Sequence, residues 1–256
     1  MSDTMSAGAT GITMVCCLFR DTPAGHAAIR YAADLAARLR VLLDVRYIVP
    51  QHGNDSVENQ RVRAAVQALV GGGSVEVSFV HDGTPIPFHP GAIVVNHEMV
   101  RQHRSTWTVA PQEETGVLVR GAGPVCIPLG DGESGSWASL LGIPIARALG
   151  LSVVFYHTTW RNPAVASDEA RAHMDPDAQL VLATAHQRAV GAGVAYHTIV
   201  EMADGVAEGI VRAALRERCS LIITARGRAT GRGSYVVQLL DESPIPVWSA
   251  PRKEAP

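Results

Sequence analysis

An arginine- and glycine-rich loop near the C-terminus is the stretch of sequence best suited to chemistry. It reads TARGRATGRGS over residues 224–234 and holds three glycines, three arginines and no acidic residue. Gly227, Gly231 and Gly233 allow close backbone approach and positive φ angles, and arginine guanidinium groups match phosphate geometry. A helix-like run begins at Ser234, so free backbone N–H groups would face the loop. The loop is therefore either a phosphate site or a solvated basic turn.

Other residue types that often act in catalysis or metal binding lack the spacing those roles need. Asp131, in GDGES, contacts a ribose or a metal, or is a plain turn residue, because Asp-Gly is a strong turn signal. The ten histidines show no ligand-like spacing with cysteine or acidic partners. Cys16 and Cys17 are neighbours on a predicted strand and would point to opposite faces, which disfavours a redox pair. The sequence thus predicts no catalytic residue, no reaction of its own and no metal site.

Composition limits the class of protein. The 256 residues suffice for one large domain or two of about 125 residues, and 47% hydrophobic content supports a buried core. A net charge of −2 argues against nucleic acid as a partner. No run approaches the about 18 apolar residues of a membrane span, and no secretory signal or disulfide framework is visible. We expect a cytoplasmic protein with reduced cysteines and no membrane partner.

Strands and helices alternate along the chain. Apolar runs in the second half predict strands at residues 125–130, 151–157, 194–200, 220–225 and 245–249. Helix-like runs there cover residues 136–149, 177–190 and 234–240. A further helix would be N-capped by Asp204, and Pro144 would kink the first helix or mark its true start. This alternation predicts a parallel sheet with helices on both faces.

The first half repeats this order in weaker form. It predicts strands at residues 12–19, 41–49, 75–80 and 92–96, with helices at 24–40 and 56–70. The prolines between residues 82 and 91 make a third helix implausible. Either a strand at 116–120 or a helix at 111–121 would close this half, and both alternatives stay open. An internal repeat of this size indicates two tandem units.

The repeated unit resembles the universal stress protein family in its tandem two-domain form. The resemblance lies in DGVAEGIVRAALRERCSLIITARGR, GSYVVQLLDESPIPVWSAP, PLGDGESGSWASLLGIPIARALGLSVVFYH and, in the first half, GHAAIRYAADLAARLRVLLDVRYIV. It implies two Rossmann-like α/β units, each a mainly parallel sheet with helices on both faces. Residues 1–123 would be a degenerate domain without the glycine loop, and residues 124–256 a domain with a shortened one. The family's two-fold pairing implies a homodimer or an intramolecular pseudo-dimer.

The resemblance also implies where a ligand would bind. Family members that bind ATP carry glycines and a Gly-Ser or Gly-Thr pair after the fourth strand, and an Asp after the first. Asp131 matches that Asp, and Gly227 matches the second glycine. Gly233 and Ser234 match the closing pair, whereas the first glycine falls on Thr224 and the spacer is shorter. The implied site residues are Asp131, Thr224, Gly227, Arg228, Gly231, Gly233 and Ser234.

The function expected from these features is stress response or signalling without catalysis. The second domain would bind ATP, another adenine nucleotide or another phosphate-bearing ligand, and a protein partner would receive the signal. Two alternatives stay open. The chain could be a ligand-independent dimeric interaction or adaptor protein, or a weak nucleotide hydrolase of the same fold.

Overall fold

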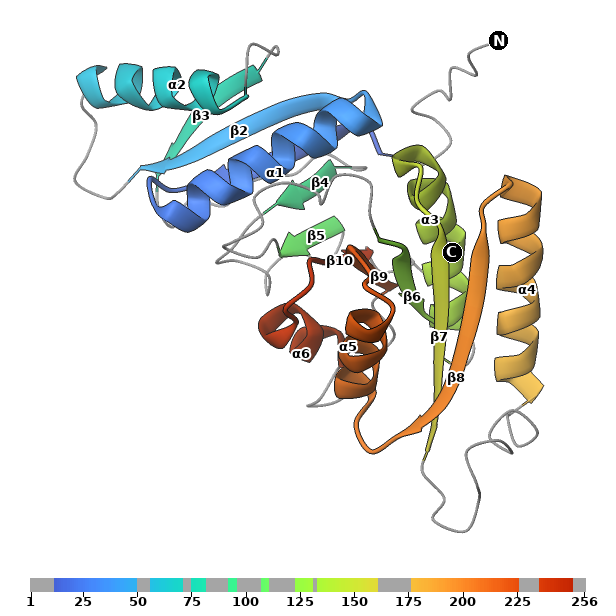
Figure 1. The fold of residues 1–256 in the computed structure, drawn as a ribbon. Helices are drawn as coiled ribbons and strands as arrows, with labels where there is room; N and C mark the ends of the chain where they lie inside the picture. Colours follow the sequence, from blue (N-terminus) through green and yellow to red (C-terminus); the bar gives the residue numbers. More distant parts are fainter. Residues whose placement is uncertain are drawn as a thin grey trace. The chain divides into compact units, whose positions relative to one another are not determined.

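The computed structural model of the chain describes residues 12–49, 56–70, 75–81, 92–95, 107–110, 123–130, 133–160, 176–225 and 235–250. The chain divides into two compact units, Met1–Arg120 and Gly121–Pro256. Figure 1 shows strands and helices in both, coloured from blue to green in the first unit and from green to red in the second. The boundary expected from the sequence lay after residue 123.

The first unit is a parallel sheet with two described helices. It contains β1 (Met14–Phe19), α1 (Pro23–Leu39), β2 (Leu42–Val49), α2 (Ser56–Val70), β3 (Val75–His81), β4 (Ala92–Val95) and β5 (Trp107–Ala110). The strand order is β3-β2-β1-β4-β5, and neighbouring strands run parallel. α1 packs on β1, β2 and β4 and also contacts α2, so these two helices share one face. Right-handed crossovers that step outward from β1 to β3 require that placement.

The second unit repeats this topology. It contains β6 (Val125–Pro128), α3 (Glu133–Leu149), β7 (Val153–Trp160), α4 (Pro176–Ala192), β8 (Tyr196–Ala203), α5 (Val206–Arg216), β9 (Leu221–Ala225), α6 (Tyr235–Glu242) and β10 (Val247–Ala250). The order is β8-β7-β6-β9-β10, so in each unit the first strand is central and the third lies at an edge. The prediction of two parallel-sheet α/β units is confirmed.

Both faces of the second sheet are covered by helices. α3 packs against α4, and α5 packs against α6. Cys126 and Ile222 point into a cluster with α5 and α6, whereas Ile127 and Ile223 meet α3 at Gly142. Adjacent residues of a strand face opposite sides of a sheet, so the two helix pairs lie on opposite faces. All five residues of β9 are buried for this reason, which explains its continuous apolar sequence.

Local sequence signals account for the ends of α1. Thr22 is the N-cap, and its Oγ1 accepts a hydrogen bond from the Gly25 N–H (3.0 Å). Pro23 follows at the first helical position, where a missing N–H costs nothing. Arg40 ends the helix in the left-handed region (φ 55°), and its N–H reaches back to the last carbonyls of the helix. Ile29 and Leu35, on the apolar stripe of α1, are fully buried.

Three expectations from the sequence need correction. The strand β5 was missed, because WTVA is only four residues long and shows no clear period; residues 111–121, the alternative, lie outside the described residues. Pro144 lies inside α3, which begins at Glu133, so Pro144 does not mark the start of that helix. The N-cap of α5 is Gly205 in an extended conformation, not Asp204. β8 continues to Ala203, which displaces the helix start by one residue.

Candidate functional site

The carboxyl ends of β6 and β9 form the topological switch point of the second unit. The two strands are parallel neighbours, with Val125 beside Leu221 and Cys126 beside Ile222. The chain leaves β6 toward α3 on one face and leaves β9 toward α6 on the other. Open α/β sheets bind ligands in the crevice that such diverging connections create. In the sequence, Asp131 comes just after this end of β6, and the loop 226–234 comes just after Ala225.

The start of α3 lies close to the end of β6. A Cβ atom at Gly135 would collide with the carbonyl oxygen of Gly130, so only glycine lets the first turn of α3 approach the strand end this closely. The first unit uses the same device: a Cβ at Gly25 would collide with the carbonyl oxygen of Arg20. Each glycine lies five residues after the carbonyl that it contacts. These matching contacts make the start of α1 the structural counterpart of the start of α3.

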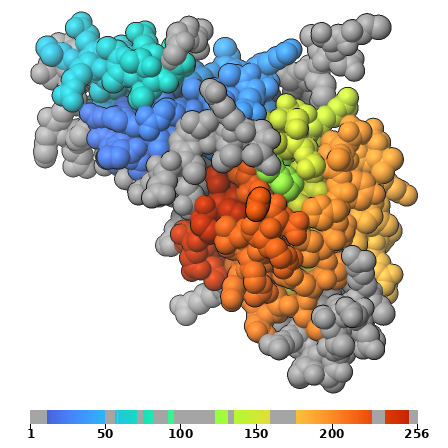
Figure 2. Space-filling view, in the orientation of Figure 1, coloured from blue at the N-terminus to red at the C-terminus, as the bar shows by residue number. Residues whose placement is uncertain are grey.

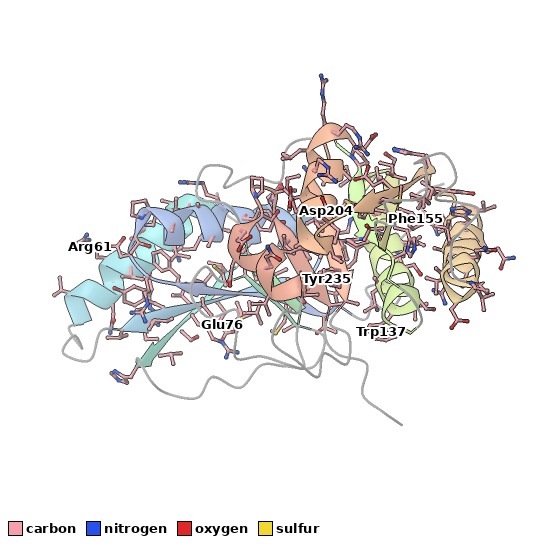
Figure 3. The ribbon with its side chains drawn as sticks, turned by 90° about the horizontal axis from the view of Figure 1, so that it is seen from below. Arg61, Glu76, Trp137, Phe155, Asp204 and Tyr235 are labelled. Atoms are coloured by element: carbon pink, nitrogen blue, oxygen red, sulfur yellow. The ribbon has the colours of Figure 1, made fainter. Side chains whose placement is uncertain are left out.

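This match identifies Asp21 as the counterpart of Asp131 in the first unit, since each aspartate follows the contacted carbonyl directly. Asp21 already has partners within its own unit. Its Oδ1 lies 2.8 Å from His26 Nε2, and its Oδ2 lies 3.5 Å from Arg61 Nη2. The His26 ring also stacks on Phe19, with ring centroids 5.6 Å apart. Arg61, which is labelled in Figure 3, reaches Asp21 from α2. Both oxygens of the Asp21 carboxylate therefore have side-chain partners within the first unit.

A buried histidine fixes the end of β6. The side chain of His157, on β7, is only 5% exposed, and its Nδ1 donates to the carbonyl oxygen of Leu129 (2.7 Å). The Leu129 N–H in turn donates to the carbonyl oxygen of Tyr156 (2.7 Å). Because a carbonyl only accepts, Nδ1 carries the ring proton in this contact. His157 thus holds the residue that leads into Gly130 and Asp131.

Thr224 and Tyr235 flank the arginine-rich loop and contact each other. Thr224 lies at the end of β9 and is fully buried, and its Oγ1 lies 3.4 Å from the hydroxyl of Tyr235. Tyr235, labelled in Figure 3, is the first residue of α6. Burial raises the pKa of Tyr235, so its hydroxyl stays protonated at neutral pH. The threonine side chain therefore faces the core, and it ties the two ends of the loop together.

Of the site residues predicted from the sequence, only Thr224 can be placed. The others lie outside the described residues: Asp131, Gly227, Arg228, Gly231, Gly233 and Ser234. They remain predictions. The described residues Gly130, Ala225 and Tyr235 lie next to them in the sequence.

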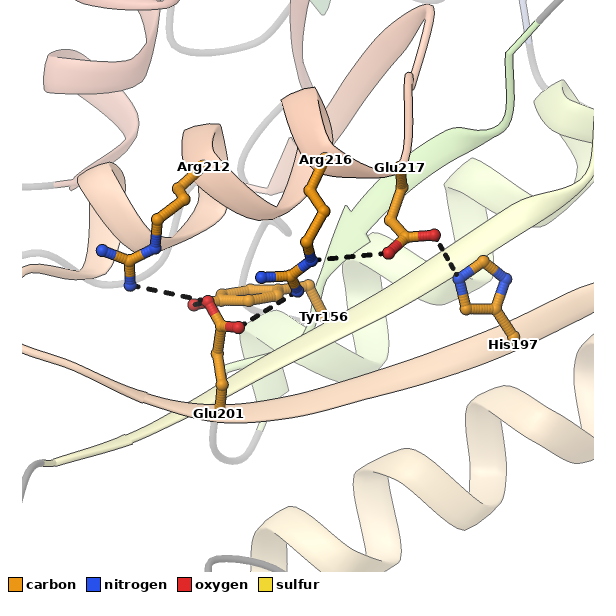
Figure 4. A network of polar contacts seen from close by, with 6 residues as sticks. All are labelled: Tyr156, His197, Glu201, Arg212, Arg216 and Glu217. Atoms are coloured by element: carbon orange, nitrogen blue, oxygen red, sulfur yellow. Dashed lines mark hydrogen bonds and ion pairs between the residues drawn. The ribbon is translucent and has the colours of Figure 1, made fainter. Parts of the chain in front are cut away.

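A polar network that sequence reasoning missed lies between β7, β8 and α5 (Figure 4). Glu201 is its centre: Oε1 accepts from the Tyr156 hydroxyl (3.2 Å), and Oε2 accepts from Arg216 Nη2 (3.1 Å). Arg212 Nη2 lies 3.6 Å from Glu201 Oε1. Burial and the nearby Glu201 charge raise the pKa of Tyr156, which therefore acts as a neutral donor. Gly209 makes room for the Tyr156 hydroxyl against α5.

The network continues along the surface to a histidine. Arg216 Nε lies 3.6 Å from Glu217 Oε1, and Glu217 Oε2 lies 3.1 Å from His197 Nε2. About half of the His197 side chain is exposed, so its contact with Glu217 contributes little to stability. The contacts join α5 to the strands β7 and β8. The signal in the sequence would have been Arg212 and Arg216, which repeat at helical spacing on α5.

Neither metal ligation nor thiol chemistry has support in the part of the chain that the structure describes. No group of three or more His, Cys, Asp and Glu residues there could hold a metal ion. All four cysteines are free and buried. Burial, followed by the charge of Asp44, raises the pKa of Cys16 to about 12, and a hydrogen bond with Cys219, followed by burial, raises that of Cys126. Both thiols stay protonated and unreactive.

No described helix is long and apolar enough to cross a membrane.

Comparison with known proteins agrees with this architecture. No protein-family model and no curated protein matches the sequence. The structure is similar to a universal stress protein from Archaeoglobus fulgidus DSM 4304, with a TM-score of 0.64 and 10% identity, over 93% of this chain and 98% of that one. It is also similar to a functionally unknown protein from Pseudomonas aeruginosa PAO1, with a TM-score of 0.59 and 14% identity, over 96% and 94% of the two chains. The chain has the fold of universal stress proteins.

Proposed function

We propose that this chain is a non-catalytic stress-response or signalling protein with one ligand site, in its second unit. The ligand is an adenine nucleotide or another phosphate-bearing molecule. The observation that carries the proposal is the switch point at the ends of β6 and β9. In the sequence, Asp131 follows one strand and the glycine- and arginine-rich loop follows the other. Both segments therefore start from the edge where ligands of such sheets bind.

Each part of this site has a distinct role in the proposal. Backbone N–H groups of Gly227, Gly231 and Gly233 hold the phosphates, and Arg228 neutralises their charge. Ser234 directly precedes α6, whose N-terminal N–H groups and dipole favour an anion. The carboxylate of Asp131 accepts hydrogen bonds from the ribose hydroxyls.

The first unit does not bind the ligand in this way. The carboxylate of Asp21, at the position equivalent to Asp131, is held by His26 and Arg61. No glycine- and arginine-rich segment follows β4 in the sequence. The proposal therefore predicts one bound ligand per chain rather than two.

Calorimetric titration of the full chain with ATP, ADP, AMP and adenosine tests the proposal. The expected result is one site per chain, with affinity that falls as phosphates are removed. Asp131→Ala should weaken binding at least about tenfold, the cost of one hydrogen bond to a charged group. Asp21→Ala is the matched control and should leave affinity unchanged. The proposal fails if millimolar nucleotide does not bind, or if Asp21→Ala and Asp131→Ala act alike.

A hydrolysis assay separates this function from the weak-hydrolase alternative. Phosphate release from ATP should not exceed the rate without protein if the site only binds its ligand. Turnover that disappears in Ser234→Ala while binding remains would favour the hydrolase.

A further inference from the structure

A groove runs between α5 and α6. It has a volume of about 510 Å³ and is lined by Ala207, Glu208, Val211, Arg212, Leu215, Gln238, Leu239 and Glu242. α5 and α6 lie on the face of the second unit that is turned toward the viewer in Figure 2, in orange and red. The volume lies within the range of ligand-binding clefts, about 300–1,000 Å³.

The groove has an apolar floor that is partly open to solvent. Leu239 is buried at its base, and Val211 is only partly buried. The side chain of Leu215, at the last turn of α5, is 52% exposed even though the core lies directly beneath. An apolar side chain left at the mouth of a cleft gains free energy when another apolar surface covers it, about 25 cal/mol for each Å² removed from water.

The polar residues of the two walls are paired within their own sides. On α5, Arg212 lies 3.9 Å from Glu208 and also contacts Glu201 of β8. On α6, the amide of Gln238 donates to Glu242 (2.9 Å). Among the described residues, no hydrogen bond or ion pair joins one wall to the other. The polar side chains of α5 and α6 therefore do not bridge the groove.

The rim carries uncompensated negative charge. Arg212 and Arg216 together compensate the carboxylates of Glu201 and Glu208. Glu242, in contrast, accepts only from the uncharged amide of Gln238. Glu242 also lies at the C-terminal end of α6, where the helix dipole is negative and the last turn has no basic residue. Glu208 is 76% exposed along its side chain. A cation placed between Glu208 and Glu242 would thus be stabilised by both.

We propose that the α5–α6 groove is the docking surface for a basic amphipathic helix of a partner protein. The apolar stripe of that helix covers Val211, Leu215 and Leu239, and its lysine or arginine side chains face Glu208 and Glu242. α5 is 11 residues long, which corresponds to about 16 Å and matches about three turns of a partner helix. Two neighbouring helices with an apolar floor bind a third helix through residues at i, i+3, i+4 and i+7. The inference does not depend on the nucleotide site.

The test uses the full chain and a fluorescein-labelled helical peptide made of leucine and lysine, about 15 residues long, with leucine on one face. Binding is followed by fluorescence anisotropy at about 0.15 M salt. Two control peptides are a shuffled peptide of the same composition, without the apolar face, and a peptide in which glutamate replaces lysine. We expect saturable binding of the leucine–lysine helix alone, weakened by added salt.

Matched variants locate the binding to the groove. Leu215→Gln should weaken peptide binding about tenfold. Val237→Gln, at a similarly exposed position of α6 outside the groove lining, should have no effect. Glu242→Gln should weaken binding and reduce its salt dependence, whereas Glu76→Gln on β3 should change neither. All three glutamine variants on the helices place a good helix former at an exposed or partly exposed position, so we expect the protein to fold.

Several results would overturn the inference. These are no binding of the leucine–lysine helix, equal binding of the glutamate peptide, or equal loss in Leu215→Gln and Val237→Gln. Sedimentation provides a separate check for a second copy of the chain as the occupant. If the protein self-associates, and Leu215→Gln but not Val237→Gln makes it monomeric, the groove binds a second copy of this chain and the proposed partner is wrong.

Discussion

Replacing Gly209 by alanine should destabilise the second unit, although the same change stabilises most helices. Gly209 lies inside α5, where alanine in place of glycine gains about 1 kcal/mol from helix propensity. Here a Cβ atom would collide with the Tyr156 hydroxyl and lie 2.8 Å from the Cβ of Ala203. Neither neighbour can move freely, since Tyr156 is a buried ring and Ala203 ends a strand.

The magnitude follows from three contributions. Overpacking costs about 1–3 kcal/mol. Displacing the Tyr156 hydroxyl from the Glu201 carboxylate loses a charge-assisted hydrogen bond of about 1.5–3 kcal/mol. After subtraction of the propensity gain of about 1 kcal/mol, we expect Gly209→Ala to lower the free energy of unfolding by about 1.5–5 kcal/mol.

Urea denaturation followed by circular dichroism measures this difference. The matched control is Gly191→Ala in α4, where an added Cβ meets nothing within 4 Å and should stabilise by up to about 1 kcal/mol. In a Tyr156→Phe background the hydroxyl is gone, so Gly209→Ala should cost at least about 1 kcal/mol less. The reasoning is refuted if Gly209→Ala stabilises as Gly191→Ala does, or if its cost is unchanged by Tyr156→Phe.

Three further predictions concern other parts of the chain. Gly135→Ala should lower the free energy of unfolding by at least about 3 kcal/mol, because the added Cβ would collide with the rigid backbone of Gly130. Thermal unfolding measures this loss, with Gly191→Ala as the control that has room for a Cβ. Stability should fall as pH rises above about 10, because Tyr156 ionises there in the unfolded chain but keeps its proton in the folded protein, where its pKa is raised. Urea unfolding at several pH values should therefore show a shallower decline in Tyr156→Phe. All four cysteines should resist a thiol reagent in the native protein and react after denaturation, and fast labelling of the native state would contradict their burial.

The sequence predicted the elements that carry a strong local period. β9 and α5 follow one another as an apolar run and an amphipathic helix, and the structure has both close to the expected bounds. The two tandem parallel-sheet units were also predicted, because strands that alternate with helices indicate parallel sheets. The order of the strands was not predicted. β5 escaped prediction because four residues cannot establish a period.

The details of the candidate site depended on contacts that a sequence does not display. Tyr156 and Glu201 are 45 residues apart, and each alone looks like an ordinary strand residue. The equivalence of Asp21 and Asp131 could be suspected from the repeat, but the matching glycine contacts at Gly25 and Gly135 give it a physical basis. The contact of Arg61 with Asp21 depends on the packing of α2 against α1, which the sequence does not display.

Photoaffinity labelling tests most directly the central claim, that the ligand site lies in the second unit at the ends of β6 and β9. The full chain would be labelled with an azido derivative of ATP, with and without excess unlabelled ATP, and the modified peptides mapped by mass spectrometry. The account predicts protectable labels only within Gly121–Pro256, lost in Asp131→Ala and retained in Asp21→Ala. Protectable labelling within Met1–Arg120, or none in either unit, would contradict it.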